Sequence, residues 1–453
     1  MSRTRHLDHS MIDIDRSAGA RIGQIQLATG VTVRHFWTYM YASLICIGMM
    51  TNMNFSQPYI LTEHLGITDQ GVAGAITGQL TGMTEIIALL LIWPCGMLAD
   101  RIGRRPVIML GIGLIGLSYA LYPWATEVIH LMYFRVIFGV GVAAVASMTA
   151  TIQNDYPVES SRGRVVGFSS AFNALGIVFA TRLVSALPKW LQDAGMEPVA
   201  AGRYAYGAAA LVCFISVLVF RFGLKGGVPE SAHKRPRWSK LVAAGFRQAR
   251  NPRILLAYMT AMTSRGDMVV AGLFVSLWAT MAEEAAGGEA AVAQYQVFLP
   301  FAVMQVFAVA WSFIFGSILD RINRVAGAVL SLALSVVAYG ALYFVESPLD
   351  LRMLPLFALL GAAMAGAIMS SMALVGQEAP PRERGAVIGL LSVFGSVGII
   401  LAAGVGGALF SASTPWAPFL LMAGAQAVLL VWASLVWLLA PGGSRAAADT
   451  SSS

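Results

Sequence analysis

The sequence predicts an all-α membrane protein in which 12 transmembrane helices form two pseudo-symmetric six-helix bundles. Three observations predict this fold class. The chain of 453 residues is 57% hydrophobic and only 12% charged, which excludes an ordinary soluble globular protein. Its apolar residues gather in long runs, and a hydrocarbon core about 30 Å thick needs roughly 20 helical residues to cross it. Motifs of the first half also recur at a nearly constant distance in the second half.

The apolar runs set the expected helices in chain order. The first six cover residues 35–60, 71–99, 106–124, 125–150, 164–187 and 204–222. The second six cover residues 254–280, 295–319, 324–345, 352–375, 385–411 and 416–440. None of these runs alternates apolar and polar residues as the strands of a membrane β-barrel do, so we expect helices throughout.

The two tails and the central segment are polar. We divide the chain into a tail (1–34), an N-terminal bundle (35–222), a linker (223–253), a C-terminal bundle (254–440) and a second tail (441–453). Within the linker, apolar residues are spaced for one face of a helix, namely Trp238, Leu241, Val242 and Phe246. We expect this amphipathic helix to lie on the membrane surface. The alternative is a solvated connection between the bundles.

The basic residues indicate how the chain is oriented. Most of the 30 Lys and Arg residues fall in the tails, the linker and every second loop, whereas the opposite loops hold only Lys189, Arg203 and Arg352. Because basic loops resist translocation, we expect both termini in the cytoplasm. The net charge of +7 follows from this topology and does not indicate nucleic-acid binding. The low share of Lys and the short tails favour a bacterial inner membrane, and residues 1–34 lack the apolar core of a cleavable signal peptide.

The repeat is visible in matched positions. Arg162 and Arg384 are 222 residues apart, and the same offset relates the glycine pairs Gly139–Gly361 and Gly167–Gly389. Asp100 and Asp320 differ by 220 residues, which one small gap absorbs. In membrane transporters that are built from two parallel six-helix halves, the solute binds at the interface between the halves, near the membrane midplane.

A loop motif follows the second apolar run. It contains Gly96, Asp100, Arg101, Gly103, Arg104 and Arg105, and a weaker copy contains Gly316, Asp320, Arg321 and Arg324, with Asn323 in place of the second glycine. The motif resembles the signature loop of the major facilitator superfamily, and its duplication implies the fold of those transporters. The resemblance implies that Asp100 accepts N–H groups near Gly385 and that Asp320 does so near Gly163 when the cytoplasmic side closes. The alternative is a basic loop with a purely topological role.

Two further patterns resemble the same superfamily. Arg135 begins an R-x-x-x-G-x-G pattern in the fourth apolar run, where proton-coupled members commonly carry an arginine. The loop after that run contains Asp155, Pro157, Arg162 and Gly163, and its copy contains Glu378, Pro380, Arg384 and Gly385. We therefore treat Arg162 and Arg384 as parts of the gating motif.

Five charged residues lie inside the expected spans, and they are candidates for solute binding or proton coupling: Glu85, Arg135, Arg182, Arg265 and Asp267. A charge near the bilayer centre costs at least about 2.5–3.5 kcal/mol even on lenient scales, so such residues are functional candidates by default. Glu85 could pair with Arg135 when deprotonated and release it when protonated, or the two could form a fixed ion pair. In the first run, Asn54 and Gln57 could orient a solute. Arg182 is expected to extend toward the outer surface.

Arg265 and Asp267 are two residues apart, so on a regular helix they point to nearly opposite sides. Either one of them meets a neighbouring helix, or the helix is broken at residues 264–266 and exposes both to the cavity. An arginine that faces the cavity implies an anionic group on the solute, because a guanidinium binds carboxylate or phosphate through two parallel hydrogen bonds.

Together these residues predict a secondary transporter that moves a small anionic or amphipathic organic solute by alternating access, coupled to protons. The alternatives are a multidrug or metabolite efflux antiporter, an uncoupled uniporter and, outside transport, a transporter-like sensor or scaffold. No cluster of His, Cys and acidic residues has the spacing of metal ligands, so we expect no enzyme activity, metal or cofactor. The expected partners are the solute, protons and membrane lipids. The resemblance implies a monomer.

Overall fold

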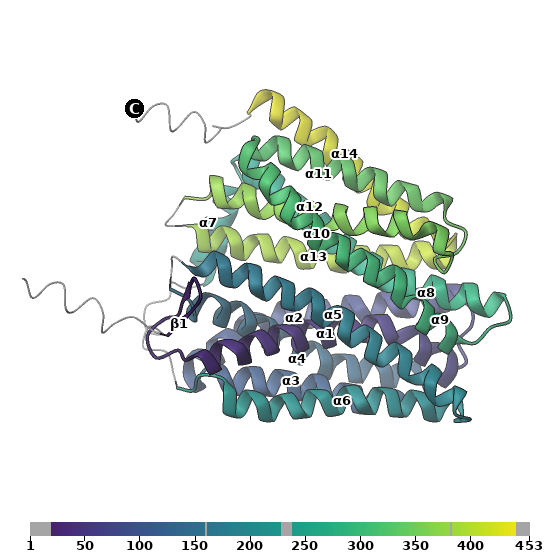
Figure 1. Ribbon diagram of the computed structural model, residues 1–453. Coiled ribbons are helices and arrows are strands. Elements are labelled where there is room, and N and C mark those ends of the chain that lie inside the picture. The colour runs from purple at the N-terminus through teal and green to yellow at the C-terminus, as the bar shows by residue number, and fades with distance from the viewer. Residues whose placement is uncertain (1–19, 159–160, 228–237, 381–382, 441–453) are drawn as a thin grey trace, which may run out of the picture.

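The computed structural model of the chain describes residues 20–158, 161–227, 238–380 and 383–440. Long helices from the two halves of the sequence form two bundles that lie side by side (Figure 1). The helices of the first half, coloured purple to teal, pack mainly against one another, and so do those of the second half, coloured green to yellow. This arrangement agrees with the duplication that the sequence predicts.

Six long helices form the N-terminal bundle: α1 (Val33–Tyr59), α2 (Gln70–Ile102), α3 (Arg104–Leu121), α4 (Val128–Asp155), α5 (Arg162–Asp193) and α6 (Pro198–Gly223). Short helical turns extend two of them, η1 (Ile60–His64) after α1 and η2 (Tyr122–Trp124) after α3. The C-terminal bundle contains α8 (Pro252–Ala285), α9 (Ala290–Gln296), α10 (Phe298–Arg321), α11 (Arg324–Ala341), η5 (Leu342–Phe344), η6 (Leu351–Met353), α12 (Leu354–Glu378), α13 (Arg384–Ala412) and α14 (Ala417–Leu439).

Among the described residues, eleven helical segments are long and apolar enough to cross a membrane. α1 is not one of them although it runs for 27 residues, because polar residues such as Thr38, Asn52 and Gln57 dilute its apolar character. The protein is therefore a multi-pass membrane protein of helical bundles, and a twelfth span formed by α1 stays a prediction.

Local sequence explains where several helices begin. The Thr32 side chain accepts from the backbone N–H of His35 at the start of α1, and Asp69 accepts from Val72 at 2.8 Å at the start of α2. Asn251 caps α8 just before Pro252. Such caps satisfy N–H groups that have no partner within the helix.

The two copies of the loop motif turn in different ways. Gly103 has a φ of +94°, a left-handed conformation that glycine adopts easily and that allows α2 to end and α3 to begin at one residue. In the second copy, Asn323 keeps an ordinary extended backbone, and its side chain caps α11 by accepting from Val325 at 2.8 Å. The second copy therefore makes its turn with a side-chain cap from asparagine, whereas the first copy makes it with the left-handed backbone of glycine.

The linker contains the helix α7 (Trp238–Gln248), which packs against α13. A Cβ on Gly245 would contact Leu390, and the rings of Phe246 and Phe394 are 6.5 Å apart. The side chain of Glu383, just before α13, accepts from Gln248 at 2.8 Å and forms an ion pair with Arg247. Its position on a membrane surface stays a prediction.

A short hairpin of β1 (Arg21–Ile22) and β2 (Ile25–Gln26), which was not expected from the sequence, precedes α1. The next residue, Leu27, is 0% exposed and forms an isolated antiparallel bridge with Pro157 in the loop between α4 and α5. Val158 donates to the Gln26 carbonyl at 3.1 Å, and Gln26 donates to the Ser161 hydroxyl at 3.0 Å. The segment before α1 thus holds the loop that precedes α5.

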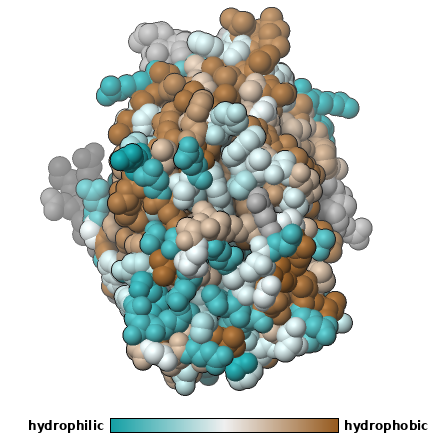
Figure 2. Space-filling model, turned by 90° about the vertical axis from the view of Figure 1, so that its right-hand side faces the viewer, coloured by the Kyte–Doolittle hydropathy of each residue, from teal (hydrophilic) through white to brown (hydrophobic). Residues whose placement is uncertain are grey.

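We name the two ends of the molecule by their charges. The basic end carries the hairpin, α7 and the loops after α2, α4, α10 and α12. The acidic end carries η1, η2 and the turns after α5 and α8, with Glu63, Asp69, Glu127, Asp193, Glu197, Glu284 and Glu289. Figure 2 shows the acidic end, where hydrophilic residues gather over the lower part of the view and apolar residues lie on the flanks.

The two bundles are in close contact at the acidic end. Phe55 of α1 accepts through its carbonyl oxygen from Ser276 of α8 at 2.7 Å, and Ser411 of α13 donates to the carbonyl of Gly71 at the start of α2. Farther along α2, a Cβ on Gly78 would overlap the carbonyl oxygen of Ala403. Only glycine allows this approach of the two backbones, so this end is closed.

The basic end is more open. Gly167 of α5 and Gly385 and Gly389 of α13 are exposed, and a Cβ on any of the three would meet no atom within 4 Å. The other bundle therefore does not cover the starts of α5 and α13. The expected contact of Asp100 with the start of α13 stays a prediction.

Candidate functional site

A buried arginine organises the interior of the N-terminal bundle. Arg135 of α4 is 0% exposed. Its guanidinium donates to Asn54 Oδ1 at 2.8 Å, to the Tyr122 hydroxyl at 3.2 Å and to Gln57 Oε1. It also lies 5.4 Å from the centre of the Phe138 ring. The structure thus brings together three residues that the sequence analysis selected, Asn54, Gln57 and Arg135, and adds Tyr122.

A second set of contacts fixes the acceptors of Arg135. Gln57 donates through Nε2 to Thr77 of α2 at 2.9 Å, and the Tyr122 hydroxyl hydrogen-bonds to Gln57 Oε1 at 3.2 Å. The ring of Tyr122 stacks on that of Tyr206, with centres 5.8 Å apart. Arg135 is therefore bound by neutral oxygens of side chains that other contacts hold in place, which makes it a rigid element of the site.

Two further charged side chains, Glu85 and Arg265, lie where the two bundles face each other. Glu85 of α2 is half-buried, and Arg265 of α8 is exposed. The Arg265 guanidinium lies within electrostatic reach of the Glu85 carboxylate, and Ser396 of α13 lies beside the same carboxylate. The stem of Arg265 passes beside Gly395, where a Cβ would overlap its Cγ. In this conformation Glu85 is therefore beside Arg265, and the expected pairing of Glu85 with Arg135 is not made.

Asp267 belongs to a different environment. α8 is unbroken through residues 264–267, which excludes the alternative of a broken helix. Asp267 is 0% exposed and accepts from Gln426 Nε2 of α14 at 2.5 Å, with Tyr339 of α11 beside the same carboxyl group. Asp267 thus binds neighbouring helices within the C-terminal bundle, while Arg265 faces the other bundle.

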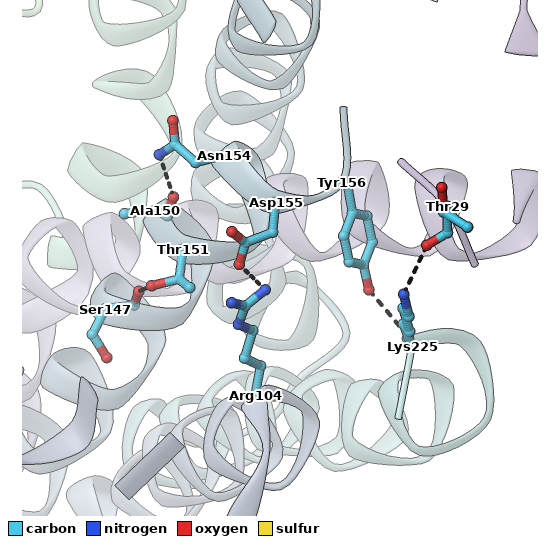
Figure 3. Close-up of polar contacts among 9 residues, drawn as sticks. All are labelled: Thr29, Arg104, Ser147, Ala150, Thr151, Asn154, Asp155, Tyr156 and Lys225. Carbon is cyan, nitrogen blue, oxygen red and sulfur yellow. Dashed lines mark hydrogen bonds and ion pairs between the residues drawn. The ribbon is translucent and has the colours of Figure 1, made fainter. Parts of the chain in front are cut away.

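The loop motif forms a polar cluster at the basic end (Figure 3). Arg104, the first residue of α3, forms an ion pair with Asp155, the last residue of α4. The next residue, Tyr156, accepts from the backbone N–H of Lys225 at 3.0 Å, and the Lys225 ammonium donates to the Thr29 carbonyl at 3.1 Å. These contacts join the ends of α3, α4 and α6 to the segment before α1.

The remaining residues that the sequence assigned to a gating motif lie at the same end. Arg101 and Arg321 are exposed, Asp100 and Gly96 are partly buried, and the guanidinium of Arg105 lies beside Gly226. Asp320 lies in α10, Arg162 begins α5 and Arg384 begins α13. The side chains of these last three residues lie outside the described ones.

The C-terminal bundle has a matching polar cluster that the sequence analysis assigned only by repeat position. Glu378, the last residue of α12, pairs with Arg253 of α8 at 2.7 Å and accepts from Asn251 at 3.3 Å. Glu378 therefore ties the end of its helix to a neighbouring helix, as Asp155 does in the first bundle. The repeat offset was the signal that could locate Glu378, whereas no sequence pattern indicated Arg253 as its partner.

Two duplicated bundles of long apolar helices, closed at one end and with charged groups where they face each other, define a membrane transport protein. The family model described as the Major Facilitator Superfamily matches residues 39–348 and 267–451. The chain therefore belongs to the Major Facilitator Superfamily, as its loop motifs indicated.

Three known proteins show how far the likeness extends. The magnetosome protein MamH of Paramagnetospirillum magneticum is 28% identical over 404 residues, which are 86% of this chain and 90% of MamH. The magnetosome protein MamZ of the same organism is 24% identical over 92% of this chain, but the chain spans only 65% of the length of MamZ. The crystal structure of the nucleoside transporter NupG matches with a TM-score of 0.68 at 14% identity, over 89% of this chain and 98% of that chain.

Proposed function

We propose that this transporter moves a small anionic organic solute across a bacterial inner membrane by alternating access, and that protons drive the movement. The observation that carries the proposal is the position of Arg265. It is an exposed guanidinium more than a dozen residues inside α8, on the side that faces the other bundle. A cation at that depth is costly unless a counter-ion or a hydrated cavity receives it, and an anionic solute is the natural counter-ion.

The neighbouring Glu85 supplies a coupling mechanism. When Glu85 is ionised, its carboxylate neutralises Arg265, and an anionic solute has to compete with it. When Glu85 takes up a proton, the guanidinium becomes available, and the solute can take the place of the carboxylate. Because proton and solute then favour each other's binding, both travel in the same direction. Ser396 can hydrogen-bond to either form of Glu85.

The two ends of the molecule support the alternating-access part of the proposal. The acidic end is closed by close backbone contact of α2 with α13, whereas the opposite bundle does not cover the starts of α5 and α13 at the basic end. If basic loops face the cytoplasm, this conformation opens inward. The motif around Asp100 and Arg104 would then close the basic end in the alternative state, by rocking of one bundle against the other.

The test is transport in liposomes that contain the purified protein and an internal pH dye. We expect proton uptake that depends on small organic anions, and not on organic cations or neutral sugars. Glu85→Gln should abolish proton movement, and Arg265→Ala should abolish anion transport. Arg250→Ala, which removes an exposed arginine after α7, is the matched control and should behave as the wild type.

Two outcomes would contradict the proposal. Anion transport without proton movement, unchanged in Glu85→Gln, would indicate a uniporter or an ion exchanger. Preference for cations or neutral solutes, with full activity in Arg265→Ala, would remove the role of Arg265 in solute binding.

A further inference from the structure

Arg182 connects the two bundles at the acidic end. It lies in the second half of α5, and from the sequence it was expected to extend to the membrane surface. Instead it is only partly exposed, and it donates to the hydroxyl of Tyr295, in α9 of the other bundle, at 3.1 Å. The expectation differs from the structure because α9 brings polar and aromatic groups to Arg182 before it reaches the surface.

Aromatic rings surround the guanidinium. Its central carbon lies 4.4 Å from the ring centre of Tyr295, 5.1 Å from that of Phe298 and 5.6 Å from that of Trp190. A cation within about 6 Å of an aromatic ring is attracted by the negative face of its π-system. Tyr295 and Phe298 belong to the C-terminal bundle and Trp190 to α5 itself, so the contact crosses between the bundles.

The short helix α9 makes a second contact with the N-terminal bundle, one residue away. Gln294 donates to the carbonyl of Phe55 in α1 at 3.3 Å, and the Phe55 ring lies 5.1 Å from that of Phe301. α9 lies at the right-hand end of the molecule in Figure 1, where the bundles meet. It is therefore held by α1 through neutral groups and by α5 through a cation.

We propose that Arg182 is the latch of the acidic end: its contact with Tyr295 and Phe298 holds that end closed while the basic end is open. The proposal rests on the alternating access of the proposed function. A cation on aromatic rings suits a contact that must break in each cycle, because the freed arginine enters water and leaves only neutral rings behind. If the contact were an ion pair instead, its opening would leave an acidic side chain without its counter-ion on the other bundle.

A variant series separates the parts of the contact. Arg182→Gln removes the guanidinium and leaves the more distant Lys189, whose ammonium lies 5.9 Å from the ring centre of Tyr295. Tyr295→Phe removes only the hydroxyl, and Tyr295→Leu removes the ring as well. The matched control is Arg203→Gln, because Arg203 lies 4.3 Å from the ring centre of Trp124 at the same end but within one bundle.

The readout is the distance between spin labels at Glu197→Cys and Glu346→Cys, one in each bundle at the acidic end, in a cysteine-free background. We expect Arg182→Gln and Tyr295→Leu to raise the ratio of open to closed molecules about tenfold, which corresponds to about 1.4 kcal/mol. Tyr295→Phe should give a smaller shift, and Arg203→Gln none. Circular dichroism and gel filtration would establish that each variant is folded.

The latch is overturned if folded Arg182→Gln keeps the wild-type distance distribution, or if Arg203→Gln shifts it equally. The measurement needs no solute, so the two proposals can fail separately. Shifted distances in a protein that transports no anion would support the latch and contradict the proposed function. Anion transport, with label distances that Arg182→Gln does not change, would support the proposed function and contradict the latch.

Discussion

Arg265 and Asp267 are two residues apart in α8, yet one is exposed to the other bundle and the other is 0% exposed within its own. Their surroundings differ accordingly: Arg265 lies within electrostatic reach of Glu85 across the interface, whereas Asp267 accepts a hydrogen bond from Gln426 of α14. Because the helix is unbroken, its periodicity alone separates them. Two neighbouring charges therefore have different expected roles, solute binding for one and bundle stability for the other.

The first prediction follows from this contrast. Asp267→Ala leaves the Gln426 amide without its acceptor, and a buried polar group without a partner costs about 1–3 kcal/mol. We expect a lower unfolding temperature in detergent, measured by circular dichroism. Arg265→Ala should leave the unfolding temperature unchanged while it abolishes anion transport, and equal destabilisation by both variants would contradict the prediction.

The second prediction concerns the buried guanidinium of Arg135. Arg135→Lys keeps the charge but replaces a planar fork by a single ammonium group, which cannot reach Asn54, Gln57 and Tyr122 in the same geometry. Each lost hydrogen bond to a charged group is worth about 1.5–3 kcal/mol, so we expect strong destabilisation in a thermal unfolding assay. Arg101→Lys, at an exposed position, should be neutral.

The third prediction uses two glycines that are one helical turn apart in α2. A Cβ on Gly78 would overlap the Ala403 carbonyl, whereas a Cβ on Gly82 would meet nothing within 4 Å. We therefore expect Gly78→Ala to hold the acidic end apart and to abolish transport, with increased distances between the Glu197→Cys and Glu346→Cys spin labels. Gly82→Ala should transport as the wild type does, and loss of activity in both would contradict the steric explanation.

The fourth prediction concerns the segment before α1. Leu27 is fully buried against the loop after α4, and burying a leucine side chain is worth about 1.5–3 kcal/mol. Leu27→Asp should release the hairpin and free Arg164, which donates to the Gln24 carbonyl at 2.9 Å. We expect faster tryptic cleavage after Arg164, detected by mass spectrometry of the fragments. Gln24→Ala keeps that carbonyl, so its cleavage rate should not change.

The fifth prediction concerns pH at the contact of α7 with α13. The hydrogen bond from Gln248, followed by the hydrogen bond and charge of Arg247, holds the pKa of Glu383 below its ordinary value of 4.5. The folded protein therefore favours the carboxylate. The stabilisation is present above pH 4.5 and is lost as the pH falls through the lower pKa of the folded state.

A spin label at Ala243→Cys on α7 would report this change by its mobility. We expect a constant signal from neutral pH down to 4.5 and increasing mobility below it. Glu383→Gln should remove the pH dependence of this signal. An unaltered transition in that variant would assign the effect to another group.

Much of the fold could be predicted because each span is a local property of the chain. A run of about 20 apolar residues must be helical in lipid, since its backbone polar groups find no other partners there. The ends were less accurate: α5 continues to Asp193, beyond the expected end at residue 187. Polar residues such as Lys189 can occupy a helix after it leaves the hydrocarbon region, and hydropathy does not register that extension.

The candidate site could be predicted only as separate residues. Glu85, Arg135 and Arg265 attract notice because charges in apolar runs are costly, and their roles in transport stay predictions. Which acid lies beside which arginine depends on helix rotation and on the positions of the two bundles. The sequence suggested Arg135 as the partner of Glu85. In the structure, the Arg135 guanidinium instead donates to neutral groups of α1 and η2.

The sequence by itself determined that this protein is a duplicated helical membrane protein with a copy of the loop motif in each half, since hydropathy, charge and repeat offset are carried by residues near in the chain. Only the tertiary structure decided the contacts that join distant segments. These include the docking of residues 20–32 on the loop before α5, the separation of Arg265 from Asp267 and the latch between Arg182 and Tyr295. Each depends on which helix faces meet, and the period of a single helix does not encode that choice.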